Sequence, residues 1–344
     1  MPSVKAMVLA GGKSTRLYPL TLAVPKPNVP IAGEPNVAHV LRYLRAHGIE
    51  DIAINVHYLA DQVRAAFGDG SRYGVRLEYL DEQELMGSAG AVKAMERFFP
   101  ETFVVVGCDD LTDIPLDELI AFHRDRGAIA TIGLVHADDV EHYGVVIVNE
   151  DGRIREFQEK PTRGTERSHL VNTGIYVFDP QIFKHIAANE FVDFGKNVFP
   201  GILASGERFF GKNMQGSYWC DIGTPSEYRR ANFDVVTGRL ALSGVVGDHR
   251  SPSAAIAPGV SIEGAVRIGA ATTVAAGARL VGPCVIGERC TIGPGAYLER
   301  TIVWDDAAIG AGARLCNAIV GAGTEVDPGA SIEDDIVAAA AAGA

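Results

Sequence analysis

Apolar residues divide the chain into two parts with different periods. In roughly the first two thirds, short apolar runs alternate with stretches of helical period. One such stretch is 35–48, where Val37, Val40 and Leu44 follow the spacing of one helix face. Strands that alternate with helices are typical of an α/β domain whose mostly parallel sheet is covered on both faces. We therefore predict an α/β domain over residues 1–236.

Uninterrupted apolar runs predict the strands of this domain, and helical periods predict its helices. The expected strands are 4–10, 51–58 and 102–107, the expected β-hairpin is 144–157, and the expected helices are 35–48, 61–70, 115–127 and 224–239. The last helix carries an N-capping signature, because Thr224 precedes Pro225 and Glu227 follows three residues after the cap.

In the last third of the chain the apolar period becomes six. With two one-residue slips, the repeated positions are Ile256, Ile262, Ile268, Val274, Leu280, Ile286, Ile292, Leu298, Val303, Ile309, Leu315, Val320, Val326 and Ile332. Glycine follows the apolar residue at Gly269, Gly287, Gly293, Gly310 and Gly321. These are the hexapeptide repeats of a left-handed parallel β-helix, where glycine permits the tight corners. The alternative, a β-sandwich, would show a period of two.

The predicted β-helix spans residues 253–337, after a linker at 237–252 and before a tail at 338–344. The composition, 47% hydrophobic and 22% charged, is that of a soluble globular protein. The five cysteines are scattered without a C-x-x-C motif, which argues against disulfides and zinc and favours a reduced cytoplasmic protein. No apolar run approaches the ~18–20 residues of a membrane span.

The net charge of −12 argues against binding to nucleic acid or to anionic membranes, so an anionic ligand needs a local positive site. The stretch 8–33, VLAGGKSTRLYPLTLAVPKPNVPIAG, holds Lys13, Arg16 and Lys26 but no acid. Gly11-Gly12 directly after a strand lets backbone amides form an anion nest, and the planar fork of Arg16 suits phosphate oxygens. The stretch predicts a polyphosphate site, although a basic surface loop is an alternative because it is not a Walker loop.

Several motifs in order make the resemblance to a known family specific. The stretch 8–33 is followed by GSAGAV at 87–92, CDDLTD at 108–113, EFQEKP at 156–161, VNTGIYVF at 171–178, DFGKNVFP at 193–200 and YWCDIGTPSEY at 218–228. Together they resemble the sugar-1-phosphate nucleotidyltransferases, and most of all the mannose-1-phosphate guanylyltransferase branch. That resemblance implies a Rossmann-like, glycosyltransferase-A-like domain followed by a left-handed parallel β-helix.

The resemblance also implies a reaction in which a nucleoside triphosphate and a sugar 1-phosphate give a nucleotide-sugar and pyrophosphate. GTP with mannose 1-phosphate is the expected pair. Two alternatives stay open: glucose 1-phosphate with dTTP, UTP or ATP, and a cyclitol phosphate such as valienol 1-phosphate. The attacking group is a phosphate oxygen that is already largely ionised, since its second pKa is ~6, so no general base is required. Catalysis then consists of positioning and charge neutralisation.

Residue roles follow from the matched motifs. The resemblance implies nucleotide binding by Leu9, Gly11, Gly12, Ser14, Thr15, Gln83, Gly87 and Ser88. It implies catalytic roles for Arg16, Lys26 and Asp109, and sugar-phosphate binding by Glu159, Lys160, Asn172 and Gly174. It also implies a Mg²⁺ cofactor held by Asp109 and Asp221, which suits a cation that takes one or two carboxylates plus phosphate oxygens.

Two functions of other classes compete with this interpretation. A non-catalytic regulatory subunit that binds nucleotide-sugars would lose the cationic and acidic residues, whereas this chain keeps Arg16, Lys26, Asp109, Lys160 and Asp221. A second activity of the β-helix, acyl transfer, generally needs a histidine base, and no histidine follows His249. The β-helix is therefore expected to join subunits of a homo-oligomer, a dimer or larger, and to do no chemistry of its own.

Overall fold

The structure of the protein, a computed structural model, describes residues 4–242, 245 and 247–338. Residues 243, 244 and 246 of the expected linker and 339–344 of the expected tail lie outside the described residues. The chain forms two compact units. The first joins the N-terminal residues up to Lys13 with Val40–Asp221, and the second joins Ser14–His39 with the residues from Ile222 onward. The domain limits expected from the sequence follow chain order and stay a prediction.

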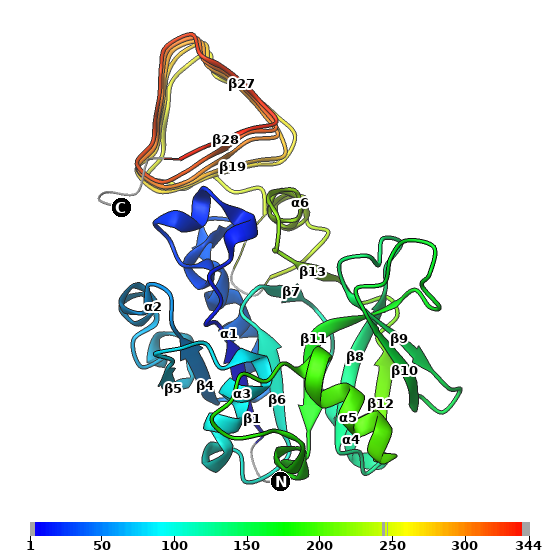
Figure 1. Cartoon of the computed structure of the whole chain (residues 1–344). Helices are drawn as coiled ribbons and strands as arrows, with labels where there is room; N and C mark the ends of the chain where they lie inside the picture. Colours follow the sequence, from blue (N-terminus) through cyan, green and yellow to red (C-terminus); the bar gives the residue numbers. More distant parts are fainter. Residues whose placement is uncertain (1–3, 243–244, 246, 339–344) are drawn as a thin grey trace. The chain divides into compact units, whose positions relative to one another are not determined.

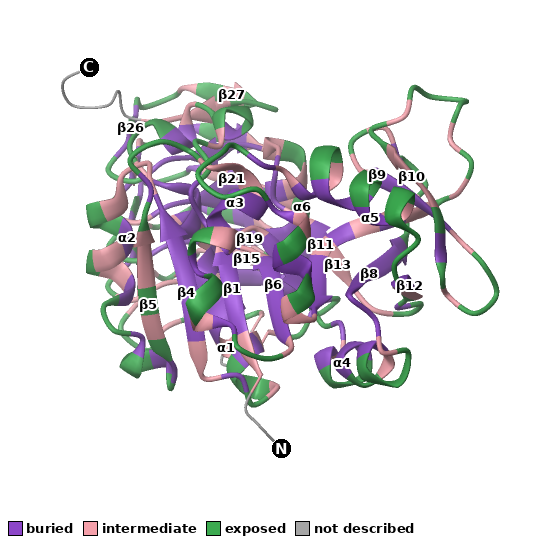
Figure 2. Ribbon diagram, turned by 60° about the horizontal axis from the view of Figure 1, so that its bottom comes forward, coloured by how far each residue is buried: buried purple, intermediate pink, exposed green. Residues whose placement is uncertain are grey.

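A nine-stranded mixed sheet forms the centre of the first unit. Its parallel half consists of β5 (Arg76–Asp81), β4 (Asp51–Val56), β1 (Lys5–Leu9) and β6 (Phe103–Gly107), in that spatial order. The middle strands β1, β4 and β6 are mostly buried, whereas the edge strand β5 is largely exposed or half-buried (Figure 2). Strands β1, β4 and β6 confirm the three expected apolar runs, because a strand covered on both faces reads as a continuous hydrophobic segment. The edge strand β5 was not expected from the sequence.

The other half of the sheet is mostly antiparallel, unlike the mostly parallel sheet expected, and only β12 and β8 pair in parallel there among the described residues. It consists of β8 (Ala130–His136), β9 (Gly144–Val148), β10 (Ile154–Glu159), β11 (Leu170–Phe178) and β12 (Phe209–Asn213). The hairpin of β9 and β10 is confirmed, and β11 runs antiparallel to β6, β8 and β9. No helix separates β8 from β11 along the chain, so the crossover connections that parallel pairs need are missing there.

Helices cover the sheet where the sequence period predicts them. The helices are α1 (Asn36–Ala46), α2 (Ala60–Phe67), α3 (Gly87–Ala94), α4 (Leu116–Asp125) and α5 (Phe199–Ser205), with 3₁₀ turns at Ser71–Tyr73, Glu96–Phe98 and Pro180–His185 and a π turn at Phe194–Val198. Three expected helices correspond to α1, α2 and α4. Within the described residues no helix could cross a membrane, because none is both long and apolar enough.

Aromatic side chains form a large part of the main core cluster of the first unit. Phe103 on β6 stacks on Phe99 and Phe183 with ring centroids 4.3 and 5.5 Å apart. Phe178 and Phe194 stack at 5.0 Å, and both are buried. Offset aromatic pairs add to the free energy gained by burying their area. This core holds β11 and the chain before α5 in place, and both carry candidate site residues.

The second unit contains the β-helix, whose triangular coils are seen end-on in Figure 1. Three five-stranded parallel sheets make its sides. Their strands are β14 (Ala255–Ile256), β17 (Thr273–Val274), β20 (Thr291–Ile292), β23 (Ala308–Ile309) and β26 (Glu325–Val326); β15 (Ser261–Glu263), β18 (Arg279–Val281), β21 (Tyr297–Glu299), β24 (Arg314–Cys316) and β27 (Ser331–Glu333); and β16 (Val266–Ile268), β19 (Cys284–Ile286), β22 (Ile302–Val303), β25 (Ile319–Val320) and β28 (Ile336–Val337). The hexapeptide prediction is confirmed.

The register also confirms that the coils shorten at the expected slips. Ile268 pairs with Ile286 on the next coil, and Ile286 pairs with Val303 on the coil after that. The second interval along the chain is one residue shorter than the first. The glycines in the repeat serve a different purpose from the expected one. None of the five has a positive φ, but a Cβ on Gly293 would lie 2.7 Å from the Ala311 nitrogen of the next coil. Glycine is needed there because successive coils approach closely.

One outer side of the β-helix is covered by the rest of the second unit. The inward residues of β19 and β22 alternate with Val285 and Ile302, which are 2% and 1% exposed although they point outward. Helix α6 (Pro225–Val236) contacts β19, and Figure 1 shows it beside that side of the triangle. The α6 cap is as predicted, because the Thr224 side chain accepts a hydrogen bond from the Glu227 amide. The side formed by β16, β19 and β22 is thus an internal interface.

The second unit also holds three 3₁₀ turns and a short strand pair from the N-terminal part of the chain. The turns are Thr15–Leu17, Leu20–Leu22 and Lys26–Asn28, and the strands are β2 (Pro30–Ile31) and β3 (Glu34–Pro35). Ile31 is fully buried, and α6 contacts β2. Residues 14–33 of the basic stretch therefore fold together with α6 and the β-helix, whereas residues 8–13 belong to the first unit.

We expect Leu298→Ala to lower the free energy of unfolding by about 2–5 kcal/mol, because Leu298 is fully buried inside the coils and leaves a cavity. Thr291→Ala is the matched control, since Thr291 lies on the neighbouring strand and is exposed. Denaturation followed by circular dichroism would measure both variants. Equal midpoints for the two would contradict the assignment of Leu298 to the β-helix core.

Candidate active site

The glycine turn after β1 rests on two buried polar side chains. Asn55, on β4, accepts a hydrogen bond from the Ala10 amide at 2.9 Å and donates one to Glu82 Oε2 at 2.5 Å. A Cβ on Gly11 would collide with Glu82 Oε2 and lie 2.7 Å from Asn55 Nδ2. Gly11 is required because the backbone approaches this pair more closely than any side chain allows. Asn55 and Glu82 were not among the residues that the motifs indicated.

Glu82 connects the glycine turn to the segment that carries Gln83, Gly87 and Ser88. Its other oxygen, Oε1, accepts a hydrogen bond from the Met86 amide at 2.9 Å. Gln83 is exposed, whereas Glu82 is 5% exposed. Asn55 is a polar residue within the carboxyl end of the apolar strand β4, and Glu82 directly follows β5. Position at the carboxyl end of a strand is a signal that could have located both, because ligands bind there in α/β sheets.

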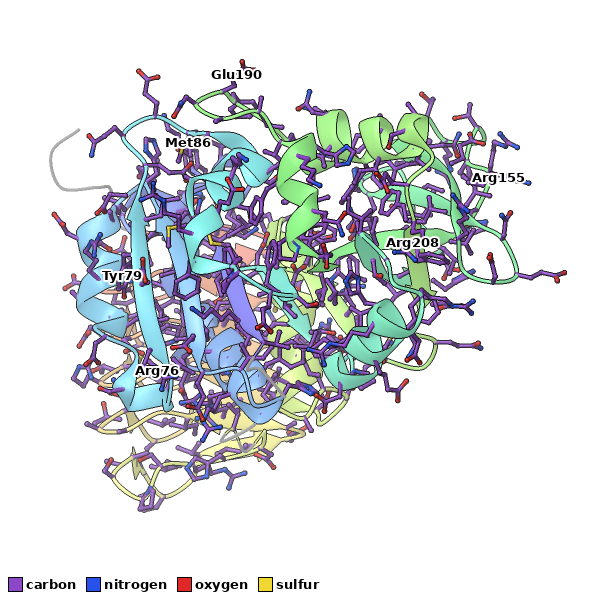
Figure 3. All side chains as sticks on the ribbon, turned by 90° about the horizontal axis from the view of Figure 1, so that it is seen from below. Arg76, Tyr79, Met86, Arg155, Glu190 and Arg208 are labelled. Carbon is purple, nitrogen blue, oxygen red and sulfur yellow. The ribbon has the colours of Figure 1, made fainter. Side chains whose placement is uncertain are left out.

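A second contact fixes Gly87 and Ser88 at the start of α3. The Val192 carbonyl accepts hydrogen bonds from the Ala89 and Gly90 amides at 2.9 and 3.1 Å. The Ser88 hydroxyl donates to Asp193 Oδ2 at 3.0 Å. Met86 and Glu190, labelled in Figure 3, mark the two segments that meet here. The Ser88 hydroxyl is therefore engaged in holding the loop.

Three carboxylates come together on the short ladder of β7 (Asp110–Thr112) and β13 (Trp219–Asp221). The two strands are antiparallel, and Asp110 lies opposite Asp221. Asp110 Oδ2 accepts from the Gly107 amide and Oδ1 accepts from Trp219 Nε1, both at 3.0 Å. Asp109 directly precedes β7. The ladder brings Asp109 and Asp221 to one place although they are far apart in the sequence.

The same strand end is tied to the glycine turn. The Cys108 amide donates to the Leu9 carbonyl at 3.0 Å, so the ends of β1 and β6 lie side by side. Cys108 is buried, and all five cysteines are free thiols. This arrangement places the acids at the carboxyl end of the parallel strands, where α/β sheets bind their ligands.

The three acids form a site whose carboxyl oxygens suit a cation. Burial, with the Asp109 and Asp221 carboxylates beside it, raises the pKa of Asp110 well above its usual range. Both oxygens of Asp110 accept hydrogen bonds. Asp109 and Asp221, whose carboxylates lie beside it, are the candidate ligands that the motifs indicate. Among the described residues no group of three His, Cys, Asp or Glu side chains could hold a metal by itself. Two carboxylates completed by phosphate oxygens and water fit a hard cation such as Mg²⁺.

A β-bulge brings Asn172 and Gly174 to this acidic ladder. The pairing of β11 with β8 shifts between Asn172 and Tyr176, and Gly174 has φ +79°. Asn172 Oδ1 accepts from the Gly174 amide, and its Nδ2 donates to the Tyr176 hydroxyl, both at 2.9 Å. A Cβ on Gly174 would lie 2.8 Å from Asp110 Oδ2. Bulges commonly redirect side chains toward functional sites.

Glu159 and Lys160 lie together where β10 ends. Lys160 Nζ is 3.9 Å from Glu159 Oε1, and partial burial raises the pKa of Glu159. A Cβ on Gly195 would lie 2.9 Å from Glu159 Oε2, so the segment before α5 crosses this carboxylate. Lys160 has φ +48° directly before Pro161, a strained conformation for lysine. Such strain is concentrated at functional sites.

The remaining candidate residues belong to the second unit. Ser14 has φ 52° and ψ 45°, the left-handed conformation that glycine adopts most readily, and its carbonyl accepts from the Thr21 hydroxyl at 2.9 Å. Thr15 and Arg16 are exposed on the turn that follows. Lys26 begins the turn Lys26–Asn28 and is only 7% exposed, which is unusual for a lysine.

Comparison with known proteins identifies the family. Residues 5–238 match the family described as nucleotidyl transferase, and residues 262–343 match the GMPPB C-terminal domain. The chain therefore belongs to the nucleotidyl transferase family. It is an enzyme of the sugar-1-phosphate nucleotidyltransferase class, as the motifs predict.

Relatives with different substrates are similar at nearly the same level. A UTP--glucose-1-phosphate uridylyltransferase of Synechocystis is 36% identical over 92% of this chain and 87% of its own length. A mannose-1-phosphate guanylyltransferase of Mycobacterium tuberculosis is 35% identical over 90% and 82%. A solved structure from Bacillus anthracis, provisionally assigned as a glucose-1-phosphate thymidylyltransferase, has a TM-score of 0.61 and 26% identity over 67% of this chain and 94% of that one.

We expect Gly11→Ala to destabilise the protein by about 1–3 kcal/mol, because the new methyl group collides with Glu82 and Asn55. Gly12→Ala is the control for folding, since a Cβ at Gly12 meets no atom within 4 Å. Thermal unfolding of the two variants would measure the difference. If Gly11→Ala unfolds at the wild-type temperature, the Asn55–Glu82 pair does not constrain the turn.

Proposed function

We propose that the protein transfers a guanylyl group from GTP to mannose 1-phosphate, giving GDP-mannose and pyrophosphate. The observation that carries this proposal is the match of residues 262–343 to the GMPPB C-terminal domain, in a chain 35% identical to a mannose-1-phosphate guanylyltransferase. Uridylyl transfer to glucose 1-phosphate is the second candidate, favoured by the 36% identical Synechocystis relative. A cyclitol phosphate is the third acceptor that we propose to test.

In the proposed reaction a phosphate oxygen of the sugar 1-phosphate attacks the α-phosphorus of the nucleotide. A new phosphorus–oxygen bond forms, the bond to the β-phosphate breaks, and pyrophosphate leaves. No proton has to be removed from the attacking oxygen, because it is already largely ionised. The task of the protein is to align two polyanions and to neutralise their charge.

We assign these tasks to the residues that the motifs indicate. Asp109 and Asp221 would hold Mg²⁺, which when bound neutralises phosphate charge and orients the phosphates. Arg16 and Lys26 would bind the phosphates of the nucleotide, and Lys160 the phosphate of the sugar. The nucleotide itself would be bound by Leu9, Gly11, Gly12, Ser14, Thr15, Gln83, Gly87 and Ser88, and the sugar by Glu159, Asn172 and Gly174.

A substrate screen tests the proposed function. GTP, UTP, ATP and dTTP would each be combined with mannose 1-phosphate, glucose 1-phosphate and valienol 1-phosphate, and pyrophosphate release would be measured. The highest kcat/KM is expected for GTP with mannose 1-phosphate. Preference for UTP with glucose 1-phosphate would select the second candidate, and no release with any pair would favour the regulatory subunit.

We expect Asp109→Asn to reduce turnover by at least ~10²-fold at saturating Mg²⁺, because it removes one of two proposed metal ligands. Asp117→Asn is the control, since the Asp117 side chain on α4 is 75% exposed. Steady-state pyrophosphate release measures both variants. Near-normal turnover of Asp109→Asn would rule out the metal assignment.

The two proposed phosphate sites should respond separately to substitution. Arg16→Ala is expected mainly to raise KM for the nucleotide, and Lys160→Ala mainly to raise KM for the sugar phosphate, because each removes a cation from one anionic substrate. Varying one substrate while the other is saturating would distinguish the effects. The opposite pattern would exchange the two roles.

We propose further that the chain forms a cytoplasmic homo-oligomer through the β-helix. The side formed by β14, β17 and β20 carries small exposed residues such as Ala255 and Thr273, which suit close packing of two flat surfaces. Thr291→Arg on this side should lower the mass measured by light scattering, whereas Ser331→Arg on another side should not. Unchanged mass for Thr291→Arg would exclude this surface. Truncation after Arg239 is less suitable as a test, because it also uncovers α6.

A further inference from the structure

We propose that the β-helix positions Lys26 through a buried hydrogen-bond relay that runs from Trp304 through Tyr228 to the chain after Lys26. Trp304, Tyr228 and Asn232 are then positioning residues, which touch no substrate themselves. The part of this proposal that concerns catalysis rests on the proposed function. The part that concerns the relay rests only on contacts inside the second unit.

Tyr228 on α6 is the centre of the relay. Its hydroxyl accepts a hydrogen bond from Trp304 Nε1 at 2.8 Å and donates one to the Pro30 carbonyl at 2.7 Å. Tyr228 is fully buried and Trp304 is 4% exposed, so water cannot replace either partner. Removing the hydroxyl would leave a buried donor and a buried acceptor unsatisfied, which is more costly than losing an exposed hydrogen bond.

Asn232, one helical turn further along α6, makes a second connection to the same segment. Its Nδ2 donates to the Tyr228 carbonyl at 3.0 Å, and its Oδ1 accepts from the Ala32 amide at 2.8 Å. Asn232 is fully buried, and Ala32 has φ +48° at the turn between β2 and β3. Helix α6 therefore holds the short segment from Pro30 to Ala32 at both ends.

This segment continues from the turn that presents Lys26. The Val29 amide donates to the Lys26 carbonyl at 3.1 Å, and the Asn36 amide donates to the Val29 carbonyl at 3.0 Å. Lys26 is almost completely buried, so its side chain has little freedom to correct a displaced backbone. A shift at Pro30 is thus transmitted to Lys26 over four residues of hydrogen-bonded chain.

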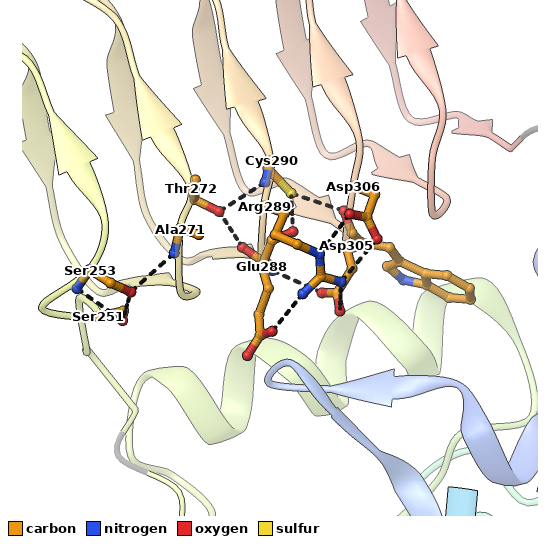
Figure 4. A network of polar contacts seen from close by, with 11 residues as sticks. Ser251, Ser253, Ala271, Thr272, Glu288, Arg289, Cys290, Asp305 and Asp306 are labelled. Atoms are coloured by element: carbon orange, nitrogen blue, oxygen red, sulfur yellow. Dashed lines mark hydrogen bonds and ion pairs between the residues drawn. The ribbon is translucent and has the colours of Figure 1, made fainter. Parts of the chain in front are cut away.

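The far end of the relay is anchored in the β-helix and not in a loose loop. The Trp304 amide donates to the Val320 carbonyl of the next coil at 2.9 Å, and Cys290 Sγ of the preceding coil lies 3.1 Å from the Trp304 carbonyl. The corner that follows is held by Arg289, which donates to both carboxylate oxygens of Asp306 at 2.7 and 3.0 Å (Figure 4). The backbone of Trp304 is therefore held by contacts with the next coil and with the preceding coil.

The expectation that the β-helix serves only assembly does not explain the buried hydrogen bonds from Trp304 through Tyr228 to Pro30. An assembly element needs no buried polar contact with the chain around Lys26, and an apolar interface would bind α6 equally well. Buried polar networks instead specify one arrangement, because every alternative leaves a polar group unsatisfied. Here the arrangement that is specified is the position of the Lys26 turn.

The test uses the full chain with Tyr228→Phe and Trp304→Phe, and with Tyr297→Phe as the matched control. Tyr297 also lies in the β-helix and its hydroxyl donates to Glu299 at 2.9 Å, but it takes no part in the relay. Trp304→Phe is the milder variant, because Tyr228 can still donate to Pro30. Circular dichroism would verify that each variant is folded.

Hydrogen exchange provides the readout that does not depend on activity. In Tyr228→Phe the amides of Asn28, Val29, Ala32 and Asn36 should exchange at least ~10-fold faster, because local opening becomes easier, and in Trp304→Phe they should exchange faster by a smaller factor. Peptides that contain β6 and β7 should exchange as in the wild type, and Tyr297→Phe should change neither region. Wild-type exchange of the four amides in Tyr228→Phe would overturn the relay.

Kinetics provides the second readout. Tyr228→Phe should lower kcat about 10- to 100-fold, the scale expected for misplaced groups, while KM for the sugar phosphate changes little. In a Lys26→Met background the same substitution should cause no further loss of kcat, since the effects of residues that act through one group are not additive. Faster exchange with unchanged kcat, or a full additional loss in the Lys26→Met background, would overturn the positioning role.

The two hypotheses fail in distinguishable ways. If the wild-type chain releases no pyrophosphate from any substrate pair, the proposed function fails and the positioning role fails with it. The exchange of the four amides would still decide whether the relay holds the turn. If the wild type is active, and the relay variants show the same unchanged exchange and kcat as the control Tyr297→Phe, the relay fails and the proposed function stands.

Discussion

The pairing of β13 with β7 is the constraint on which the site of the first unit depends. It places Asp221 opposite Asp110 and in the same site as Asp109, so that three carboxyl groups share one partly buried place. Such a cluster is unfavourable by itself, because burial and mutual repulsion both oppose ionisation. Trp219 and the Gly107 amide stabilise one of the acids, and the others remain suited to a cation. The fold keeps these acids together although their clustering is electrostatically unfavourable, which is consistent with a site that binds metal and phosphate.

Close backbone approach is the second recurrent device. Gly11 rests on the Asn55–Glu82 pair, and Gly174 on β11 approaches Asp110. In the β-helix, Gly293 meets the backbone of the next coil. In each case the absence of a side chain lets two parts of the chain come nearer than van der Waals contact with a Cβ would allow. The glycines of the first unit thereby bring backbone amides and acids to one edge of the sheet.

The β-helix combines two kinds of packing. Inside, aliphatic residues of successive coils stack in register, which needs only the six-residue period. Outside, one of its three sides is buried under α6, and Trp304 reaches the hydroxyl of Tyr228 across that interface. The internal packing makes the β-helix rigid. The interface with α6 connects this rigid element to the chain around Lys26. A rigid solenoid is well suited to this purpose, because each coil is held by its neighbours.

The sequence by itself determined the two architectures, most strands and helices, the slips of the β-helix and the enzyme class, because periodicity and ordered local motifs are properties of consecutive residues. It misjudged the direction of half the sheet, since strand direction depends on how distant segments connect. It pointed to Asp109 through its place after an apolar strand as well as through resemblance, and to Asp221 only through resemblance. It did not indicate Asn55, Glu82 or the Trp304–Tyr228 relay. Those residues are defined by burial and by partners far along the chain, and only the tertiary structure decides which polar groups meet in a place that water cannot reach.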